Sequence, residues 1–124
     1  MGRRKQRCNA GKVLEDIAYK LLRSEQYAGQ KFYFSVAENV LYEDKKGTQG
    51  EIDVFAVRHI RNNKRYIVLV ECKLGDRRTK ATKQLRRAKE HLQKQFPNVR
   101  IFCIYVHSYK RKTGRYKIEW LRRL

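Results

Sequence analysis

Cysteine is scarce in this chain of 124 residues, and its scarcity excludes two kinds of small protein. Three cysteines are an odd number, and two of them lie in apolar runs where a small hydrophobic side chain fits, so a disulfide framework is not expected. No two cysteines have the Cys-x-x-Cys spacing and the three histidines are scattered, so a structural zinc site has no support. The cysteines are Cys8, Cys72 and Cys103.

A long apolar run is also missing behind the basic start Met-Gly-Arg-Arg-Lys. Gln6 stands where a myristoylation signal requires serine or threonine. We therefore expect no membrane partner, and a cytoplasmic protein in a reducing, intracellular compartment.

Acidic residues are few: 12 Asp and Glu stand against 31 Lys and Arg, which gives a net charge of +19 at pH 7. The basic residues are spread along the chain rather than gathered in one tail. A field of this sign attracts polyanions, so nucleic acid is the partner that the composition favours. The alternative, a charged surface that serves only solubility, needs far fewer net charges.

The stretch from Tyr66 to Lys73 predicts a buried central strand with charged residues at its end. Its first five residues are apolar or aromatic and mostly β-branched, which is typical of a strand covered on both faces. Because side chains alternate along a strand, Glu71 and Lys73 project from one face and Cys72 from the other. A carboxylate and an ammonium group are costly at such a place unless they are paired or bind a ligand. The strand end is therefore a candidate site, and the alternative is an ion pair that only supports the fold.

The rest of the pattern predicts a single α/β domain, residues 11–124, after a flexible basic arm, residues 1–10. Apolar residues at helical spacing predict one helix from Gly11 to about Gly29 and a second helix over 81–95. Strands are expected at 31–42, with a bend near Glu38-Asn39, and at 51–57, 66–73, 99–106 and 116–121. We expect a mixed sheet flanked by helices, in the order αβββαββ.

A short turn at Arg61-Asn62-Asn63-Lys64 is predicted to join the second and third strands into an antiparallel hairpin, because asparagine tolerates left-handed backbone angles. With the turn near residue 62, Asp53 falls opposite about Glu71. Both carboxylates then lie at one end of the hairpin.

Glu15 is a third acidic residue that can approach this strand end. It lies roughly 20° outside the apolar stripe of the first helix, on the side toward the sheet; alternatively, it complements the dipole at the start of that helix. If Glu15, Asp53 and Glu71 converge, their carboxylates offer hard oxygen ligands for Mg²⁺, or for Mn²⁺ in its place. The main-chain carbonyl of Cys72 would be a further ligand. Such an ion can polarise a phosphodiester, and Lys73 can orient or deprotonate the attacking water.

Three segments together resemble the PD-(D/E)XK nuclease superfamily, and within it the small archaeal Holliday-junction resolvases. They are Gly11-Lys12-Val13-Leu14-Glu15-Asp16-Ile17-Ala18, Gly50-Glu51-Ile52-Asp53-Val54 and Glu71-Cys72-Lys73. The resemblance covers roughly residues 11 to 95. The proline that gives the motif its name is absent from this sequence, where Gly50-Glu51-Ile52 stands before Asp53.

The resemblance implies a restriction-endonuclease-like core and metal-dependent hydrolysis of DNA phosphodiesters. It implies that Glu15, Asp53 and Glu71 carry the metal and that Lys73 assists the attacking water. Gln84, early in the second helix, would be an auxiliary polar residue in catalysis. The implied substrate is a four-way (Holliday) junction, and because cutting two strands needs two active sites, we expect a homodimer.

Basic residues in the arm, beside the site and in a turn near 107–115 are the candidates for contact with the nucleic-acid backbone. They are Arg3, Arg4, Arg77, Arg78, Lys80, Lys110, Arg111, Lys112 and Arg115. Two other functions stay open: a nuclease for duplex DNA, of restriction or mobile-element type, and a basic nucleic-acid-binding module without catalysis. In such a module, Tyr105, Tyr109 and Tyr116 would stack on unpaired bases, although packing in the core explains them equally well.

Overall fold

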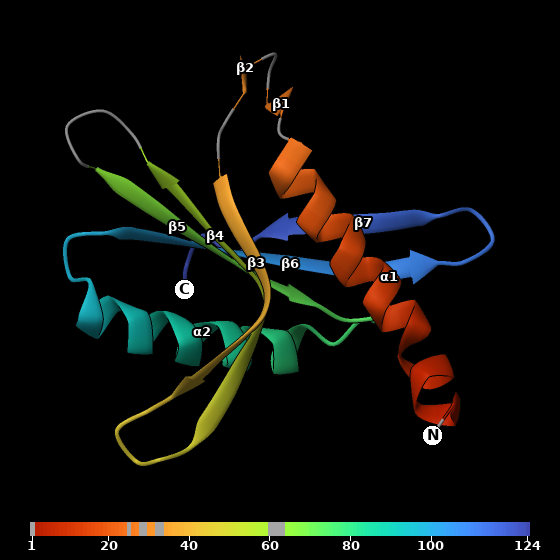
Figure 1. Cartoon of the computed structure of the whole chain (residues 1–124), viewed down its shortest axis with the longest axis horizontal. Helices are drawn as coiled ribbons and strands as arrows, with labels where there is room; N and C mark the ends of the chain where they lie inside the picture. Colours follow the sequence, from red (N-terminus) through yellow and green to blue (C-terminus); the bar gives the residue numbers. More distant parts are fainter. Residues whose placement is uncertain (1, 25, 28–29, 32–33, 60–63) are drawn as a thin grey trace.

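The computed structural model describes residues 2–24, 26–27, 30–31, 34–59 and 64–124, and the side chains of 11–23, 35–58 and 64–124. These residues form a five-stranded sheet with two helices packed on it, and a separate two-stranded pair (Figure 1). The elements are α1 (Gly2–Ser24), β1 (Gln26–Tyr27), β2 (Gln30–Lys31), β3 (Phe34–Glu43), β4 (Gln49–His59), β5 (Arg65–Cys72), α2 (Arg78–Gln95), β6 (Arg100–Lys110) and β7 (Arg115–Trp120).

The main sheet is mixed and has the strand order β3-β4-β5-β6-β7. Neighbouring strands are antiparallel except β5 and β6, which are parallel. α2 makes the crossover between these two strands, as a parallel pair requires. Apart from β1 and β2, the order is the expected αβββαββ, so the prediction of an α/β fold with a mixed sheet flanked by helices is confirmed.

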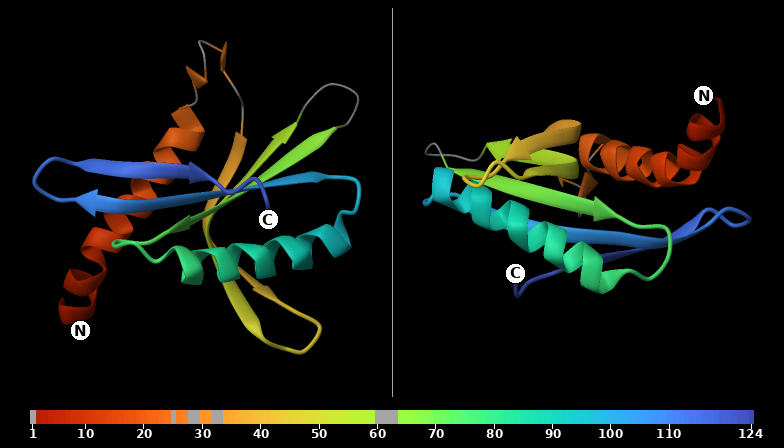
Figure 2. Two further views of the ribbon diagram at one scale, coloured as in Figure 1. Left: turned by 180° about the vertical axis from the view of Figure 1, so that it is seen from behind. Right: turned by 90° about the horizontal axis from the view of Figure 1, so that it is seen from below.

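The two helices cover opposite faces of the sheet (Figure 2), because successive strand residues belong to two different apolar clusters. On β5, Val68 and Val70 pack in the cluster that contains Leu14 of α1. Leu69, between them, packs in the cluster that contains Leu85 of α2. All five side chains are at most 3% exposed, and burial of each contributes about 1.5–3 kcal/mol. β5 is therefore buried on both faces, as its apolar run predicts.

α1 begins at Gly2, well before the predicted start at Gly11, and ends at Ser24. Residues 2–10, expected as an arm, therefore belong to this helix. The reason is intrinsic propensity, because arginine, lysine and glutamine lose little side-chain freedom in a helix and no proline interrupts them. Over the residues described, neither α1 nor α2 has the length and apolar character that a membrane crossing requires.

The five strands of the main sheet correspond to the five expected strands, although Lys31 of the first belongs to β2 and β6 continues to Lys110. Two local features shape these strands. The bend expected near Glu38-Asn39 is present, since Asn39 has a positive φ of 53°. β6 and β7 continue into the segment expected as a basic turn, so that Lys110 pairs with Arg115. The pairing passes an irregularity before Lys110, where Ser108 has a φ of 58°. Residues 61–63 of the predicted turn lie outside the described residues.

Candidate active site

Asp53 and Glu71 lie side by side, as the hairpin register predicts. Val54 pairs with Val70, so the next position along the two strands brings Asp53 opposite Glu71. The two carboxyl groups are hydrogen-bonded to each other. Asp53 Oδ2 also accepts a hydrogen bond of 2.8 Å from the main-chain N–H of Cys72. Two carboxyl groups share a hydrogen bond only when one of them carries a proton.

Burial makes Glu71 the more strongly perturbed member of this pair. Its side chain is almost fully buried, at 3% exposure. Burial first, and then the hydrogen bond and the charge of Asp53, raise the pKa of Glu71 well above its usual range, while Lys73 acts in the opposite direction. In the absence of a cation, Glu71 therefore holds its proton at neutral pH.

Glu15 approaches the pair from α1. Its side chain is 19% exposed. Burial, followed by the negative charge of Asp53, raises the pKa of Glu15 to about 7 against the effect of Lys12. Lys12 Nζ lies 3.9 Å from Glu15 and 2.6 Å from Glu38. The structure thus brings Glu15 within electrostatic range of Asp53.

The three acids do not form a ready-made metal centre. Within the described part of the chain, no group of three or more His, Cys, Asp or Glu side chains has the arrangement that could hold an ion. Asp53 and Glu71 are in contact, whereas Glu15 is linked to them only through the charge of Asp53, which raises the pKa of Glu15. Any cation held here would therefore have the Asp53–Glu71 pair as its main ligands.

Lys73 and Cys72 extend from β5 in different ways. The charge of Lys73 lowers the pKa of Glu71, so its ammonium group lies near the pair. The Lys73 N–H donates to the Val106 carbonyl at 3.0 Å, which continues the contact between β5 and β6. Cys72 Sγ lies 4.0 Å from the main-chain oxygen of Leu14, and burial raises the pKa of its thiol. Cys72 therefore reaches the site only through its main chain.

Gln84 carries the one buried side-chain acceptor without a hydrogen-bond partner among the described residues, its Oε1 atom. It lies on α2 next to Leu85 and between Ala81 and Ala88, which are at most 2% exposed. An unpaired buried amide oxygen costs about 1–3 kcal/mol. A water or ligand with a hydrogen-bond donor would remove that cost, and the auxiliary catalytic role that the resemblance implies for Gln84 stays a prediction.

Tyr42 lies within range of the Glu71 charge, and its ring contacts Arg87 and His91 of α2. The sequence pattern did not single out these three residues as part of the site. The Tyr42 ring lies over Gly50, its partner across β3 and β4, so closely that a Cβ atom on Gly50 would be 2.3 Å from it. His91 stacks on the ring at 4.9 Å, and Arg87 Cζ lies 5.7 Å from its centroid. Burial raises the pKa of Tyr42 and the charge of Glu71 raises it further. Glycine just before an acidic motif, opposite a large aromatic residue, is the signal that could have identified this packing.

Arg87 ties the turn between β3 and β4 to α2. Its Nη2 atom donates to Asp44 Oδ2 at 3.2 Å and to the Thr48 carbonyl at 3.1 Å. Asp44 Oδ1 accepts hydrogen bonds from the N–H groups of Lys46 and Thr48. Because β4 carries Asp53, these contacts help to fix the strand that positions the acidic pair.

Tyr105 is fully buried, at 0% exposure, so its proposed role as a base-stacking residue is wrong. Its hydroxyl accepts a hydrogen bond of 2.7 Å from the Arg77 N–H and donates to the Gly75 carbonyl at 3.3 Å. It therefore fixes the loop between β5 and α2. Tyr109 and Tyr116 are partly buried against the cluster under α1, which supports the packing alternative.

The basic residues expected to contact nucleic acid have different surroundings. Arg77 and Lys80 are exposed near the start of α2. Arg78 pairs with Glu119, which also lies 3.0 Å from His107 Nε2. The side chains at the tip of the β6–β7 hairpin are exposed, namely Lys110, Arg111, Lys112 and Arg115. The side chains of Arg3 and Arg4 lie outside the described residues.

Comparison with models of known protein families, with curated proteins and with solved structures gave no match. The likeness to the nuclease superfamily therefore rests on the three sequence segments alone.

Proposed function

We propose that this protein is a Mg²⁺-dependent DNA endonuclease of the PD-(D/E)XK type with a restriction-endonuclease-like core. The observation that carries the proposal is the contact between Asp53 and Glu71, with the charge of Lys73 beside them. These are the acidic and basic residue types of the motif, and they meet at the end of a central strand. Ligand sites in α/β sheets are common at such strand ends.

The donor atoms of the site fit a hard divalent cation, Mg²⁺ or Mn²⁺. Asp53, Glu71 and the main-chain carbonyl of Cys72 would hold it, and Glu15 would join them from α1. The raised pKa values of Glu71 and Glu15 support this fit, because they indicate buried acids without enough positive charge around them. The unpaired Oε1 of Gln84 is a buried acceptor on the helix that covers the same face.

The ion, when bound, supplies Lewis-acid polarisation of the phosphodiester. Lys73 orients the attacking water or neutralises the charge that develops on the phosphate oxygens. Asp53 is held in place by the Cys72 N–H. No covalent nucleophile is needed, and the sulfur of Cys72 packs toward α1 instead.

The net charge of +19 would bring DNA to the acidic pair. Arg77 and Lys80 follow Lys73 by a few residues and are exposed, so they are suited to contact phosphates near the bond that is cut. We propose branched DNA, a four-way junction, as the substrate. Cutting it symmetrically needs two sites, and because each chain has one, the enzyme would act as a homodimer.

A basic nucleic-acid-binding module without catalysis is the second candidate. The hydrogen bond between Asp53 and Glu71 is a satisfied contact in its own right, and the described residues contain no ready-made metal cluster. In this alternative the acidic pair only closes the end of the hairpin. A nuclease for duplex DNA would use the same site on another substrate.

Cleavage of a labelled four-way junction, a linear duplex and a single strand, with Mg²⁺ and with EDTA, separates these functions. The variant is Glu71→Gln, which keeps the shape and the hydrogen bonds of a protonated glutamate. The control is Glu90→Gln, an exposed acid on α2. Paired cuts in the junction alone, lost with EDTA and in Glu71→Gln but kept in Glu90→Gln, would support the resolvase. Cleavage of all three forms of DNA would reject the four-way junction as the specific substrate. Tight binding of DNA without cleavage would reject the proposed nuclease activity.

A further inference from the structure

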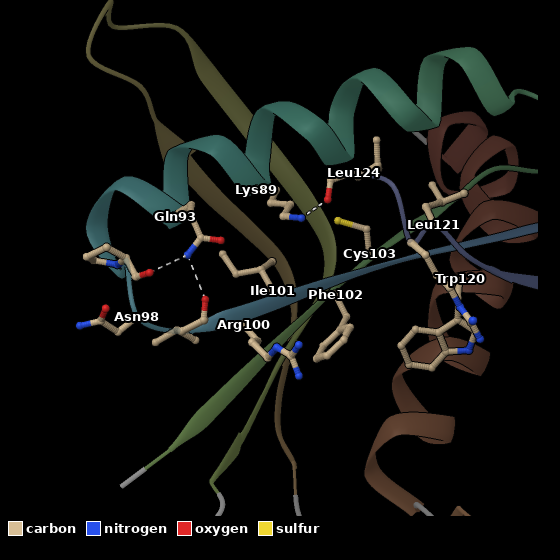
Figure 3. Close-up of a pocket in the computed structure, with 13 residues that line it drawn as sticks. Lys89, Gln93, Asn98, Arg100, Ile101, Phe102, Cys103, Trp120, Leu121 and Leu124 are labelled. Atoms are coloured by element: carbon tan, nitrogen blue, oxygen red, sulfur yellow. Dashed lines mark hydrogen bonds between the residues drawn. The ribbon is translucent and has the colours of Figure 1, made fainter.

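A groove of about 880 Å³ is lined by residues of α2 and of the ends of β6 and β7, from both faces of the sheet, and lies outside the candidate active site (Figure 3). Every charged side chain that lines it is basic: Lys89, Arg100 and Arg122. Lys89 donates to the main-chain oxygen of Leu124, so Arg100 and Arg122 are the two that remain at the rim. Both are exposed.

Three aromatic rings from adjacent strands, Tyr66, Phe102 and Trp120, form a row, here called the aromatic row. Phe102 and Trp120 also line the groove. Phe102 lies 5.6 Å from Tyr66 and 6.2 Å from Trp120, and is nearly perpendicular to both, at 84° and 82°. Figure 3 shows Arg100, Phe102 and Trp120 on one side of β6 and Ile101 and Cys103 on the other.

The aromatic row lies on the face of the sheet that α1 packs against, not on the face of α2. Side chains alternate along a strand, so Phe102 lies on the same face of the sheet as Ile104, and Trp120 lies on that face because it pairs with Ile104. Ile104 belongs to the cluster under α1. Phe102 pairs with Val68 of β5, and Val68 lies roughly 10 Å from Glu71 along that strand. The aromatic row is therefore separate from the acidic pair.

The aromatic row is accessible to a ligand. Phe102 is 36% exposed, Trp120 40%, and the neighbouring Ile118 43%. Large apolar side chains gathered in one exposed patch mark a binding surface. Unpaired nucleobases are flat and stack on aromatic rings of this kind, and basic side chains at the edge contact the phosphates between them.

We propose that the aromatic row and the basic rim bind an unpaired DNA strand. Bases stack on Phe102 and Trp120, while Arg100 and Arg122 contact the backbone. A second copy of the chain is the less favourable occupant, because Arg100 and Arg122 would face another molecule of the same high positive charge. The choice of DNA rests on the proposed function, whereas the stacking does not depend on catalysis.

Trp120 is the only tryptophan in the chain, so its fluorescence reports on the aromatic row directly. Titration with a short oligothymidylate in EDTA should quench this fluorescence until it saturates. Phe102→Ala should weaken binding about fivefold to 150-fold, the effect of losing one stacked base. Phe102→Tyr, which keeps the ring, should bind like wild type. Leu41→Ala, which changes an apolar residue of β3 that is 71% exposed, is the matched control and should bind normally.

The salt dependence of binding tests the basic rim. Arg122→Gln should reduce the slope of log affinity against log salt by about one. Lys46→Gln, in the turn between β3 and β4, is the control for charge and should keep the slope.

Several results would overturn the proposal. The first is that the single strand does not quench Trp120 fluorescence. The second is that a duplex binds as tightly as the single strand, and the third is that Phe102→Ala and Leu41→Ala weaken binding equally. Tighter binding of oligouridylate would overturn the choice of DNA. Emission that changes with protein concentration instead of DNA, with a dimer mass by light scattering, would assign the surface to a second copy. Because EDTA prevents metal-dependent cleavage, a failure of single-strand binding in this experiment would not count against the proposed nuclease. Conversely, if the oligonucleotide quenches Trp120 fluorescence but the protein cuts no DNA, only the nuclease is rejected.

Discussion

Asp53 Oδ2 accepts a hydrogen bond of 2.8 Å from the main-chain N–H of Cys72, the residue between Glu71 and Lys73. This bond joins the acidic motif of β4 to the Glu-Cys-Lys segment of β5. Because the amide belongs to a strand whose neighbouring residues are buried, it holds the Asp53 carboxylate in one orientation. The two halves of the proposed site are therefore positioned by the sheet.

Gly50→Ala should destabilise the fold by about 1–3 kcal/mol. A Cβ atom there would lie 2.3 Å from the Tyr42 ring, so the ring and the Arg87 side chain packed on it must move. Urea unfolding followed by circular dichroism measures the effect. Gly75→Ala is the matched control, because nothing lies within 4 Å of a Cβ at that position. Equal stability of the two variants would contradict the close packing of Tyr42 on Gly50.

Asp44→Asn should destabilise the protein at neutral pH and lose its effect in acid. The N–H groups of Thr48 and Lys46, and then the guanidinium of Arg87, hold the pKa of Asp44 below its ordinary value of 3.8. A carboxyl group with a lowered folded-state pKa stabilises the fold above its unfolded pKa, and the contribution disappears as the pH falls through the folded-state value. The unfolding midpoints of variant and wild type should therefore converge below pH 3.8. Asp76→Asn, which changes an exposed aspartate before α2, is the control. If the unfolding midpoint of Asp44→Asn differs from that of wild type by the same amount over the whole pH range, the charge of Asp44 is not involved.

Tyr105→Phe should destabilise the protein by about 1–2 kcal/mol and loosen the loop before α2. The variant loses the hydroxyl that joins the Arg77 N–H and the Gly75 carbonyl. Faster hydrogen exchange of the Arg77 amide, measured by NMR, would show the loosening directly. Tyr109→Phe, at a partly buried tyrosine under α1, should leave that amide unchanged. Unchanged exchange in Tyr105→Phe would mean that other contacts fix the loop.

The contact between Asp53 and Glu71 could be predicted from the sequence because it depends on a local hairpin. Once the turn is placed near residue 62, the pairing of the two strands is fixed by counting residues. The central burial of β5 follows for a similar reason, since its apolar run is visible in the sequence.

The packing of Tyr42, Arg87 and Tyr105 could not be predicted in this way. The contact of Arg87 with the turn between β3 and β4 depends on where α2 lies across the sheet. The sequence pattern does not determine that position. The tyrosines near the basic turn illustrate the same limit, because the pattern does not tell a stacking residue from a buried one. Tyr105 is buried, whereas Phe102 and Trp120 of the aromatic row are exposed.

Binding of Mn²⁺ to the metal-free protein, measured by isothermal titration calorimetry, tests most directly whether Asp53 and Glu71 form a metal site. Wild type should show one saturable site per chain. Asp53→Asn should lose it, although asparagine keeps an oxygen that can accept the Cys72 hydrogen bond, and Glu90→Gln should bind like wild type. Equal binding by wild type and Asp53→Asn, or no saturable binding by wild type, would contradict the metal site and favour the non-catalytic binding module.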